Sequence, residues 1–284
     1  MQKGCRPINW NHRMTLKIRA SQTSGWNDCP RRGASRSYRD MITDAGFELN
    51  DYAFMVRFVS STIGTSCHEG AKFALQNKLE GKQFSLDDMT DISINYFNEA
   101  KESGLAYDTI TGKPSDADIQ IQNIMRSYYH FLLPNINPIA VEFEMEAEMQ
   151  DGTIITAHAD VIETISIRDL KTGKSPDDYH SQLGTYSILA KTNGICNPKK
   201  LLVDWIPRTA VSKNYEEPKS LLFNVEICEE EAKQTIKSIV SQVNNFTESK
   251  SPSAFPANTN SILCSEKFCP AYATDFCKLK EKKE

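Results

Sequence analysis

Apolar residues recur at helical spacing through much of the first half of the chain. Ala71, Leu75 and Leu79 lie four positions apart, as on one face of a helix. Ser85 with Asp88 three residues later is the pattern of a capping box, which opens a helix. Helices are therefore predicted after Pro30 and over 64–81, 85–97 and 116–132, with residues 83–133 as a helical block.

Strict alternation of apolar and polar residues begins at Val141. Through Met149 every second residue is apolar and the positions between them are glutamates, as in a strand with one buried face. Asp151-Gly152 then marks a tight hairpin turn. Further strands are predicted over 153–163, 165–172, 201–206 and 221–227, and helices over 177–191 and 229–246. This order of elements predicts an α/β or α+β fold with a mixed central β-sheet flanked by helices.

The composition is that of an ordinary globular protein. The 284 residues are 39% hydrophobic and 25% charged, which allows one large domain or two small ones. No apolar run reaches the roughly 18–20 residues of a membrane helix, and residues 1–14 lack the apolar core of a signal peptide. We therefore expect a soluble, cytoplasmic protein without a membrane partner.

Charge is distributed unevenly along the chain. The net charge is −4, yet residues 1–40 contain nine basic and two acidic side chains, a net +7 that leaves −11 for the other 244 residues. A basic end on an acidic body is expected of an arm that contacts phosphates, and equally of a solvated leader. We assign residues 1–20 to a basic leader that is flexible or forms a sheet edge, and residues 21–284 to a single domain.

Two charged residues on one predicted strand suggest chemistry. Asp169 and Lys171 are two positions apart and therefore face the same side, and a hairpin can bring Asp160 beside them from the adjoining strand. Two carboxylates and a lysine are the minimum set for metal-assisted phosphodiester hydrolysis, because carboxylates hold a hard divalent cation and a lysine offsets developing negative charge. A surface ion pair would show the same D-x-K pattern. The hydrolysis interpretation therefore needs support from other residues.

Three further residues supply that support. His68, in the motif G-T-x-x-H, is a candidate third ligand, and Gln182 and Tyr186 lie four residues apart on one helix face. Together with Asp160 and the motif D-x-K-T, they occur in the order and spacing of RecB-like nucleases of the PD-(D/E)XK superfamily. The chain resembles these nucleases over residues 64–190, and the resemblance implies a restriction-endonuclease-like core.

The resemblance also implies roles for the site residues. The catalytic set would be Lys171, Asp169, Asp160, Gln182 and Tyr186. The ligands of Mg²⁺ or Mn²⁺ would be His68, Asp160, Asp169 and the main-chain carbonyl of Leu170. Glu142 or Glu144 could add a ligand, although four alternating glutamates are more simply a solvated strand face.

The eight cysteines are placed unevenly. The motif S-x-W-x-x-C-P-R-R and three cysteines near the C-terminus resemble the iron–sulfur nucleases of this group, among them the fourth family of CRISPR-associated exonucleases and the AddB nuclease domain. The resemblance implies a [4Fe–4S] cluster that joins the N- and C-terminal segments, held by Cys29, Cys264, Cys269 and Cys277. Their spacing, C-x4-C-x7-C in place of C-x2-C-x5-C, leaves tetrahedral Zn²⁺ as an alternative. The expected bystanders are Cys5, Cys67, Cys196 and Cys228.

These features together predict a metal-dependent DNA exonuclease that acts on single-stranded DNA or duplex ends. Its phosphate contacts would be Arg31, Arg32, Arg36 and Arg39. Rival interpretations are a double-strand exonuclease of phage recombination, a nuclease subunit of a larger helicase complex, and a non-catalytic DNA-binding adaptor of a recombination or CRISPR-type complex. A zinc-stapled interaction protein is a further rival. Beside DNA, the partners would be other recombination or CRISPR proteins or a second copy of the chain.

Overall fold

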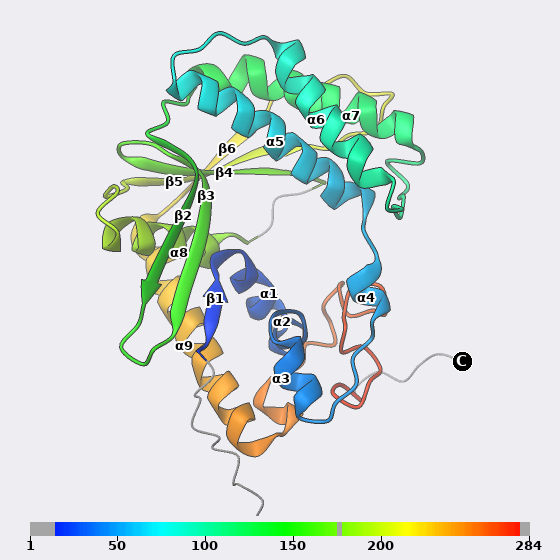
Figure 1. The fold of residues 1–284 in the computed structure, drawn as a ribbon, viewed down its shortest axis with the longest axis vertical. Coiled ribbons are helices and arrows are strands. Elements are labelled where there is room, and N and C mark those ends of the chain that lie inside the picture. Colours follow the sequence, from blue (N-terminus) through cyan, green and yellow to red (C-terminus); the bar gives the residue numbers. More distant parts are fainter. Residues whose placement is uncertain (1–14, 175–177, 279–284) are drawn as a thin grey trace, which may run out of the picture.

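A mixed β-sheet forms the centre of the molecule (Figure 1). The structure, a computed structural model, describes residues 15–174 and 178–278, and within these ranges six strands form one sheet. The strands are β1 (Lys17–Arg19), β2 (Ala140–Glu148), β3 (Ile154–Ile162), β4 (Ser166–Gly173), β5 (Lys200–Pro207) and β6 (Lys219–Phe223). Their order is β1-β3-β4-β5-β6, with β2 paired to β3. The predicted α/β fold with a mixed sheet is confirmed.

Helices cover both faces of this sheet (Figure 1). They are α1 (Thr23–Asp28), α2 (Pro30–Ser37), α3 (Arg39–Asp44), α4 (Tyr52–Met55), α5 (Val59–Leu79), α6 (Leu86–Lys101), α7 (Pro114–Ser127), α8 (His180–Thr192) and α9 (Val225–Ser249). A π-helical turn continues α7 over Tyr128–Leu132, and single 3-10 turns cover Ala20–Gln22, Leu133–Asn135 and Pro252–Ala254. No helix in the described part of the chain is long and apolar enough to cross a membrane.

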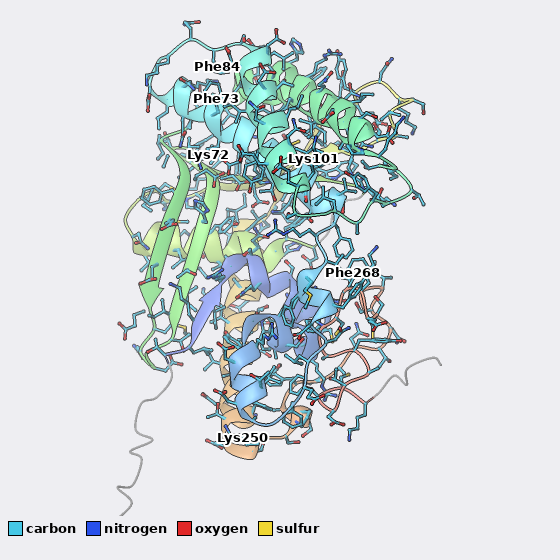
Figure 2. The ribbon with its side chains drawn as sticks, turned by 45° about the vertical axis from the view of Figure 1, so that its right-hand side comes forward. Lys72, Phe73, Phe84, Lys101, Lys250 and Phe268 are labelled. Atoms are coloured by element: carbon cyan, nitrogen blue, oxygen red, sulfur yellow. The ribbon has the colours of Figure 1, made fainter. Side chains whose placement is uncertain are left out.

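One face of the sheet packs against α5, α6 and α7. These helices share an apolar core with Val161, Leu170 and Ile206, which come from three strands. This layer contains the predicted helical block, and Figure 2 shows Phe73 and Phe84 close together in it. Their ring centroids are 6.2 Å apart. This edge-to-face contact packs α5 against the loop that precedes α6.

The opposite face packs against α8, α9 and the two ends of the described chain. Trp26 of α1 contacts Phe255 of the C-terminal segment, with ring centroids 5.7 Å apart. Phe246 of α9 and Phe276 belong to the same core, so the loop-rich tail after residue 250 is fixed by its aromatic side chains. Aromatic packing therefore joins the N- and C-terminal segments.

The sheet splits beside β3. Antiparallel β2 pairs with β3 at every position except Glu142 and Asp160, and so occupies one of its edges. On the other edge, parallel β1 pairs only with residues 154–156, and antiparallel β4 pairs only with Val161 and Ile162. Residues 157–160 consequently have no strand partner on that edge. Asp160 lies at the end of this gap, where β3 and β4 separate.

The strand predicted over 221–227 is wrong in its second half. β6 ends at Phe223, and Val225 begins α9. The change occurs because the side chain of Asn224 accepts a hydrogen bond of 2.9 Å from the N–H of Ile227 and caps the helix. The apolar run was interpreted as one strand, although its asparagine was a helix-start signal.

Two other predicted boundaries also move. The helix predicted over 64–81 begins at Val59, so the G-T-x-x-H motif lies inside α5 and not at its start. Lys17–Arg19 forms the edge strand β1, so this part of residues 1–20 lies in the sheet. The basic residues among 1–14 lie outside the described residues.

Gly184 is the contact point between α8 and α9. A Cβ built at this position would lie 1.9 Å from the carbonyl oxygen of Cys228. Gly184→Ala is therefore expected to destabilise the protein by about 3 kcal/mol, because backbone of α9 would have to move. Chemical denaturation measures this change. Gly25→Ala is the matched control, since no atom approaches that position within 4 Å; equal stability of the two variants would contradict this account.

Candidate active site

The gap beside β3 brings together the residues of the predicted D…D-x-K pattern. Lys171 Nζ lies 2.5 Å from Asp169 Oδ2, and both side chains come from β4. Asp160 Oδ2 on β3 accepts a 2.7 Å hydrogen bond from the N–H of Leu170. This bond joins the two strands where their regular pairing has ended. Both carboxylates and the lysine thus converge on one position.

Asp169 is held from behind by α8. Its Oδ1 accepts hydrogen bonds from Gln182 Nε2 at 3.1 Å and from the hydroxyl of Tyr186 at 3.3 Å. Gln182 Nε2 also lies 2.6 Å from the Tyr186 hydroxyl oxygen. The carboxylate side chain is only 2% exposed, so these bonds compensate for its lost hydration. The close approach of α9 at Gly184, between the two residues, fixes the helix that carries them.

His68 reaches the site from α5. Its Nδ1 lies 3.4 Å from Asp160 Oδ2. One turn earlier, a Cβ at Gly64 would lie 3.1 Å from Thr172 Oγ1. The glycine of G-T-x-x-H therefore lets α5 come close to the D-x-K-T strand, and this approach brings the imidazole within reach of Asp160.

Glu142 on β2 completes a group of potential ligands. One ligand atom each from His68, Glu142 and Asp160 lies within 4.8 Å of the other two. Glu142 has a φ of +49°, a left-handed conformation that residues other than glycine rarely adopt, and its side chain is 17% exposed. The interpretation of all four alternating glutamates as a solvated face is therefore wrong for Glu142. Glu144 lines the adjoining cleft but lies outside this group.

The charges of the site are strongly coupled. Burial raises the pKa of Asp169, Lys171 opposes this rise and Asp160 adds to it. Burial would also raise the pKa of Asp160, but His68, Lys171 and the Leu170 N–H bring it below its usual value. For His68, burial lowers the pKa, yet Asp160 outweighs burial and raises it to about 9. A divalent cation would therefore displace the proton that His68 shares with Asp160.

The site opens into a cleft of about 770 Å³. Lys17 and Arg19 of β1 line one side of this cleft, and Asp160, Asp169 and Lys171 line its floor. Both cations were counted in the basic region of the sequence, yet they were not singled out as site residues. Parallel pairing of β1 with β3 brings them here, a contact across more than 130 residues that no local pattern indicates.

The side chains of the four arginines predicted to contact DNA all bond to other residues of the protein. Arg32 is 6% exposed and pairs with Asp28 at 2.5 Å, so its prediction as a phosphate contact is corrected to a structural role. Arg31 and Arg36 donate to backbone carbonyls of other segments, and Arg39 pairs with an exposed aspartate. DNA contact by Arg31, Arg36 and Arg39 stays a prediction.

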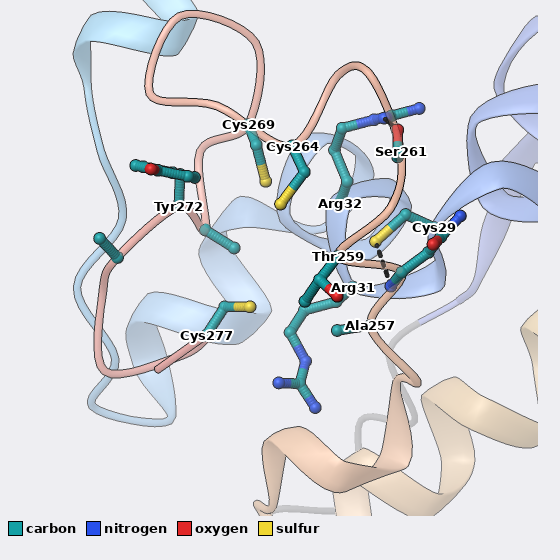
Figure 3. A pocket seen from close by; sticks show the side chains of 13 residues that line it. Cys29, Arg31, Arg32, Ala257, Thr259, Ser261, Cys264, Cys269, Tyr272 and Cys277 are labelled. Atoms are coloured by element: carbon teal, nitrogen blue, oxygen red, sulfur yellow. Dashed lines mark hydrogen bonds between the residues drawn. The ribbon is translucent and has the colours of Figure 1, made fainter. Parts of the chain in front are cut away.

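The four predicted cluster cysteines line one cavity. Figure 3 shows Cys29, Cys264, Cys269 and Cys277 around this common space, into which their sulfur atoms point. Burial raises the pKa of the Cys269 thiol to about 11; a hydrogen bond from the Ala271 N–H acts against the rise, and the other three cysteines add to it. Four neighbouring thiolates repel one another unless a cation lies among them. The donor set therefore fits a metal group.

The spacing of these sulfur atoms bears on the choice between zinc and a cluster. Tetrahedral zinc with Zn–S bonds of about 2.3 Å places its sulfur ligands about 3.8 Å apart. Among the described residues, no three of the four sulfur atoms lie within 4.8 Å of one another. The described sulfur positions are therefore not those of a preformed zinc tetrahedron. The described bystanders Cys67, Cys196 and Cys228 do not line the cavity.

Comparison with known proteins places this geometry in a family. The sequence matches the PD-(D/E)XK nuclease superfamily over residues 20–274, and no curated protein matches the chain. The crystal structure of a "putative exonuclease" from Eubacterium rectale is similar, with a TM-score of 0.54 and 12% identity over 92% of this chain and 93% of that one. The structure of SSO0001 has a TM-score of 0.30 at 12% identity, over 80% of this chain and 79% of that one. Because the family match spans most of the sheet and both helical layers, the chain belongs to the PD-(D/E)XK nuclease superfamily.

Proposed function

We propose that this protein is a metal-dependent DNA exonuclease that hydrolyses phosphodiester bonds at the ends of single-stranded DNA or of duplexes. The observation that carries the proposal is the pair of Lys171 and Asp169 beside Asp160, at the floor of an open cleft in a nuclease-superfamily chain. The similar structure from Eubacterium rectale is named a "putative exonuclease", which also supports exonuclease activity.

The proposed ligands of Mg²⁺ or Mn²⁺ are His68, Glu142, Asp160, Asp169 and the carbonyl of Leu170. Hard divalent cations prefer oxygen ligands, and a neutral imidazole is a common metal ligand beside them. The bound ion would act as a Lewis acid at the scissile phosphate. The close approach of three of these ligand atoms supports the assignment.

Lys171 is the proposed catalytic cation. Burial lowers the pKa of Lys171, but Asp169 and Asp160 outweigh burial and raise it, so the ammonium stays charged at neutral pH. From this position Nζ offsets the negative charge that develops on the phosphate. Gln182 and Tyr186 act through Asp169, because their hydrogen bonds fix the carboxylate that holds the ammonium.

Glu142→Gln tests the role of Glu142 as a metal ligand, for which the alternating sequence pattern alone gave little support. The substitution keeps the shape of the side chain but removes a negative oxygen ligand, so we expect the affinity for Mn²⁺ to fall about tenfold. Calorimetric titration of the metal measures this loss. Glu148→Gln, on the exposed end of the same strand, is the control and should bind as the wild type does. Equal affinities of the two variants would remove Glu142 from the ligand set.

Lys17 and Arg19 are proposed to contact the phosphates of the bound strand. They line the cleft beside the catalytic residues, and Lys17 is held only by an exposed pair with Glu146 at 3.3 Å. The double variant Lys17→Ala/Arg19→Ala should raise KM several-fold and flatten the salt dependence of binding, with kcat nearly unchanged. Steady-state kinetics at two salt concentrations measures both effects. An unchanged KM would place the substrate elsewhere.

We also propose that Cys29, Cys264, Cys269 and Cys277 hold a structural [4Fe–4S] cluster. Their common cavity and the likeness of their sequence motif to that of iron–sulfur nucleases support a cluster. Iron and sulfide analysis of anaerobically purified protein tests this assignment. One tightly bound zinc ion and no iron would replace it.

The activity is tested with DNA substrates that differ only in their ends. Anaerobically purified protein with Mn²⁺ should degrade end-labelled linear single-stranded DNA and leave a covalently closed single-stranded circle intact. Cleavage of the circle would show an endonuclease. Degradation of linear duplex alone would favour the double-strand exonuclease, and binding without degradation of any substrate would favour the adaptor.

A further inference from the structure

Helix α2 begins directly after Cys29 and lies along the C-terminal segment that carries the other three cysteines (Figure 3). Arg31, in its first turn, donates from Nη2 to the carbonyl of Pro252 at 2.7 Å and from Nε to the carbonyl of Phe255 at 3.0 Å. The N–H of Arg31 also donates to the carbonyl of Pro256 at 3.3 Å. The start of the C-terminal segment is thus bonded to α2.

Arg32 fixes the middle of the same segment. Its Nη1 lies 3.0 Å from Ser261 Oγ and 2.5 Å from Asp28 Oδ2. Ser261 Oγ also donates to Asp28 at 2.7 Å, and the guanidinium is nearly fully buried by this network. Asn258 donates its N–H to the sulfur of Cys29 at 3.4 Å. The chain is therefore held beside Cys29 three residues before it reaches Cys264.

Arg36 fixes the loop between the next two cysteines. Its Nη2 and Nε donate to the carbonyl of Phe268 at 2.8 and 3.3 Å, and Nη2 also lies 3.4 Å from the carbonyl of Ala53. Phe268 directly precedes Cys269, and Figure 2 labels it in the C-terminal segment. One helix thus holds the segment at five residues between Pro252 and Phe268.

We propose that Arg31, Arg32 and Arg36 form a clamp that assembles the four-cysteine cavity before any metal group is bound. Hydrogen bonds from a charged guanidinium are stronger than those between neutral groups, and none of those described here uses a thiol. Many small metal sites instead fold only when the metal binds. Here the bound group would enter a cavity that is already shaped, and the arginines act as positioning residues for its ligands.

The inference rests on the proposed metal group at the cysteines, and release of that group tests it. Arg36→Ala should release iron to a chelator such as bathophenanthroline at least tenfold faster than the wild type, and Arg36→Lys should fall between them. Arg39→Ala is the matched control, because this arginine follows on α3 yet bonds to exposed Asp51 and not to a carbonyl of the segment. Its release rate should equal that of the wild type, and an unchanged rate in Arg36→Ala would overturn the clamp.

Hydrogen exchange of the metal-free protein provides a second test that needs no iron. In protein stripped by chelator, amides of residues 252–268 should stay protected in the wild type and in Arg39→Ala, and exchange at least tenfold faster in Arg36→Ala. Loss of protection in the stripped wild type would show that the metal group, not the arginines, closes the cavity. If the purified protein contains zinc, the cluster assignment fails, while the same zinc-release and exchange measurements still decide the clamp.

Discussion

Lys171→Met is expected to abolish cleavage while the fold persists. The variant keeps most of the aliphatic side chain but removes the cation 2.5 Å from Asp169, so the charge that develops on the phosphate is no longer offset. Loss of one such electrostatic contact typically costs about 10³-fold in rate. Single-turnover degradation of end-labelled DNA measures this loss, and circular dichroism checks the fold. The exposed Lys200→Met on β5 is the matched control and should retain full activity.

Lys171→Met has a second expected effect, on Asp169. Burial already raises the pKa of Asp169, and Lys171 opposes that rise. Removal of the lysine raises the pKa further, so a larger fraction of the carboxyl is protonated and the variant should need a higher pH to bind Mn²⁺. Metal titrations at several pH values separate this effect from the lost chemistry. Activity above one-tenth of the wild type at saturating metal would contradict the role of Lys171.

Local chemistry explains what the sequence predicted well. Gly152 at the hairpin has a φ of +82°, which its D-G signal indicated, and Ser85 and Asp88 form the reciprocal bonds of a capping box. Asp169 and Lys171 share a face because alternate residues of any strand do. Each of these features depends on residues that lie close together in the chain, so it can be predicted from one sequence.

The position of the site depends on contacts that the sequence does not display. The gap in the sheet exists because β1 and β4 each cover only one end of β3. No periodicity predicts that residues 17–19 pair in parallel with a strand more than 130 positions later. The cleft and its cations Lys17 and Arg19 follow from that pairing.

The side chains that are hardest to assign from the sequence are those whose pattern fits two different roles. Glu142 shares its alternation with three glutamates that are more exposed, and it differs from them in its burial and its left-handed backbone conformation. The arginines after Cys29 look like a DNA-binding cluster in the sequence. The guanidinium groups of Arg31 and Arg36 donate to carbonyls in a segment more than 200 residues away, and that of Arg32 pairs with Asp28. Arginine donates to phosphates and also to backbone carbonyls, so residue type alone does not decide between them.

Cys264→Ser is expected to remove the metal group of the cysteine cavity. Serine fills nearly the same volume, but its hydroxyl is a poor ligand where a thiolate is needed. A cluster-bound wild type contains iron and absorbs visible light, and the variant should have lost both. Cys196→Ser is the matched control, because this half-buried cysteine lies outside the cavity and its loss should leave the iron content unchanged.

The stability of Cys264→Ser distinguishes a group that reinforces the fold from one that creates it. A group that binds only the folded chain stabilises it, so its loss should lower Tm by roughly 5–10 °C. The aromatic contact of Trp26 with Phe255 and the guanidinium bonds of α2 do not involve Cys264, so the chain ends should remain docked. Limited proteolysis should therefore leave the C-terminal segment uncut in the folded variant. Rapid cleavage after residue 250 at temperatures well below Tm would show that the metal group itself holds the two ends together.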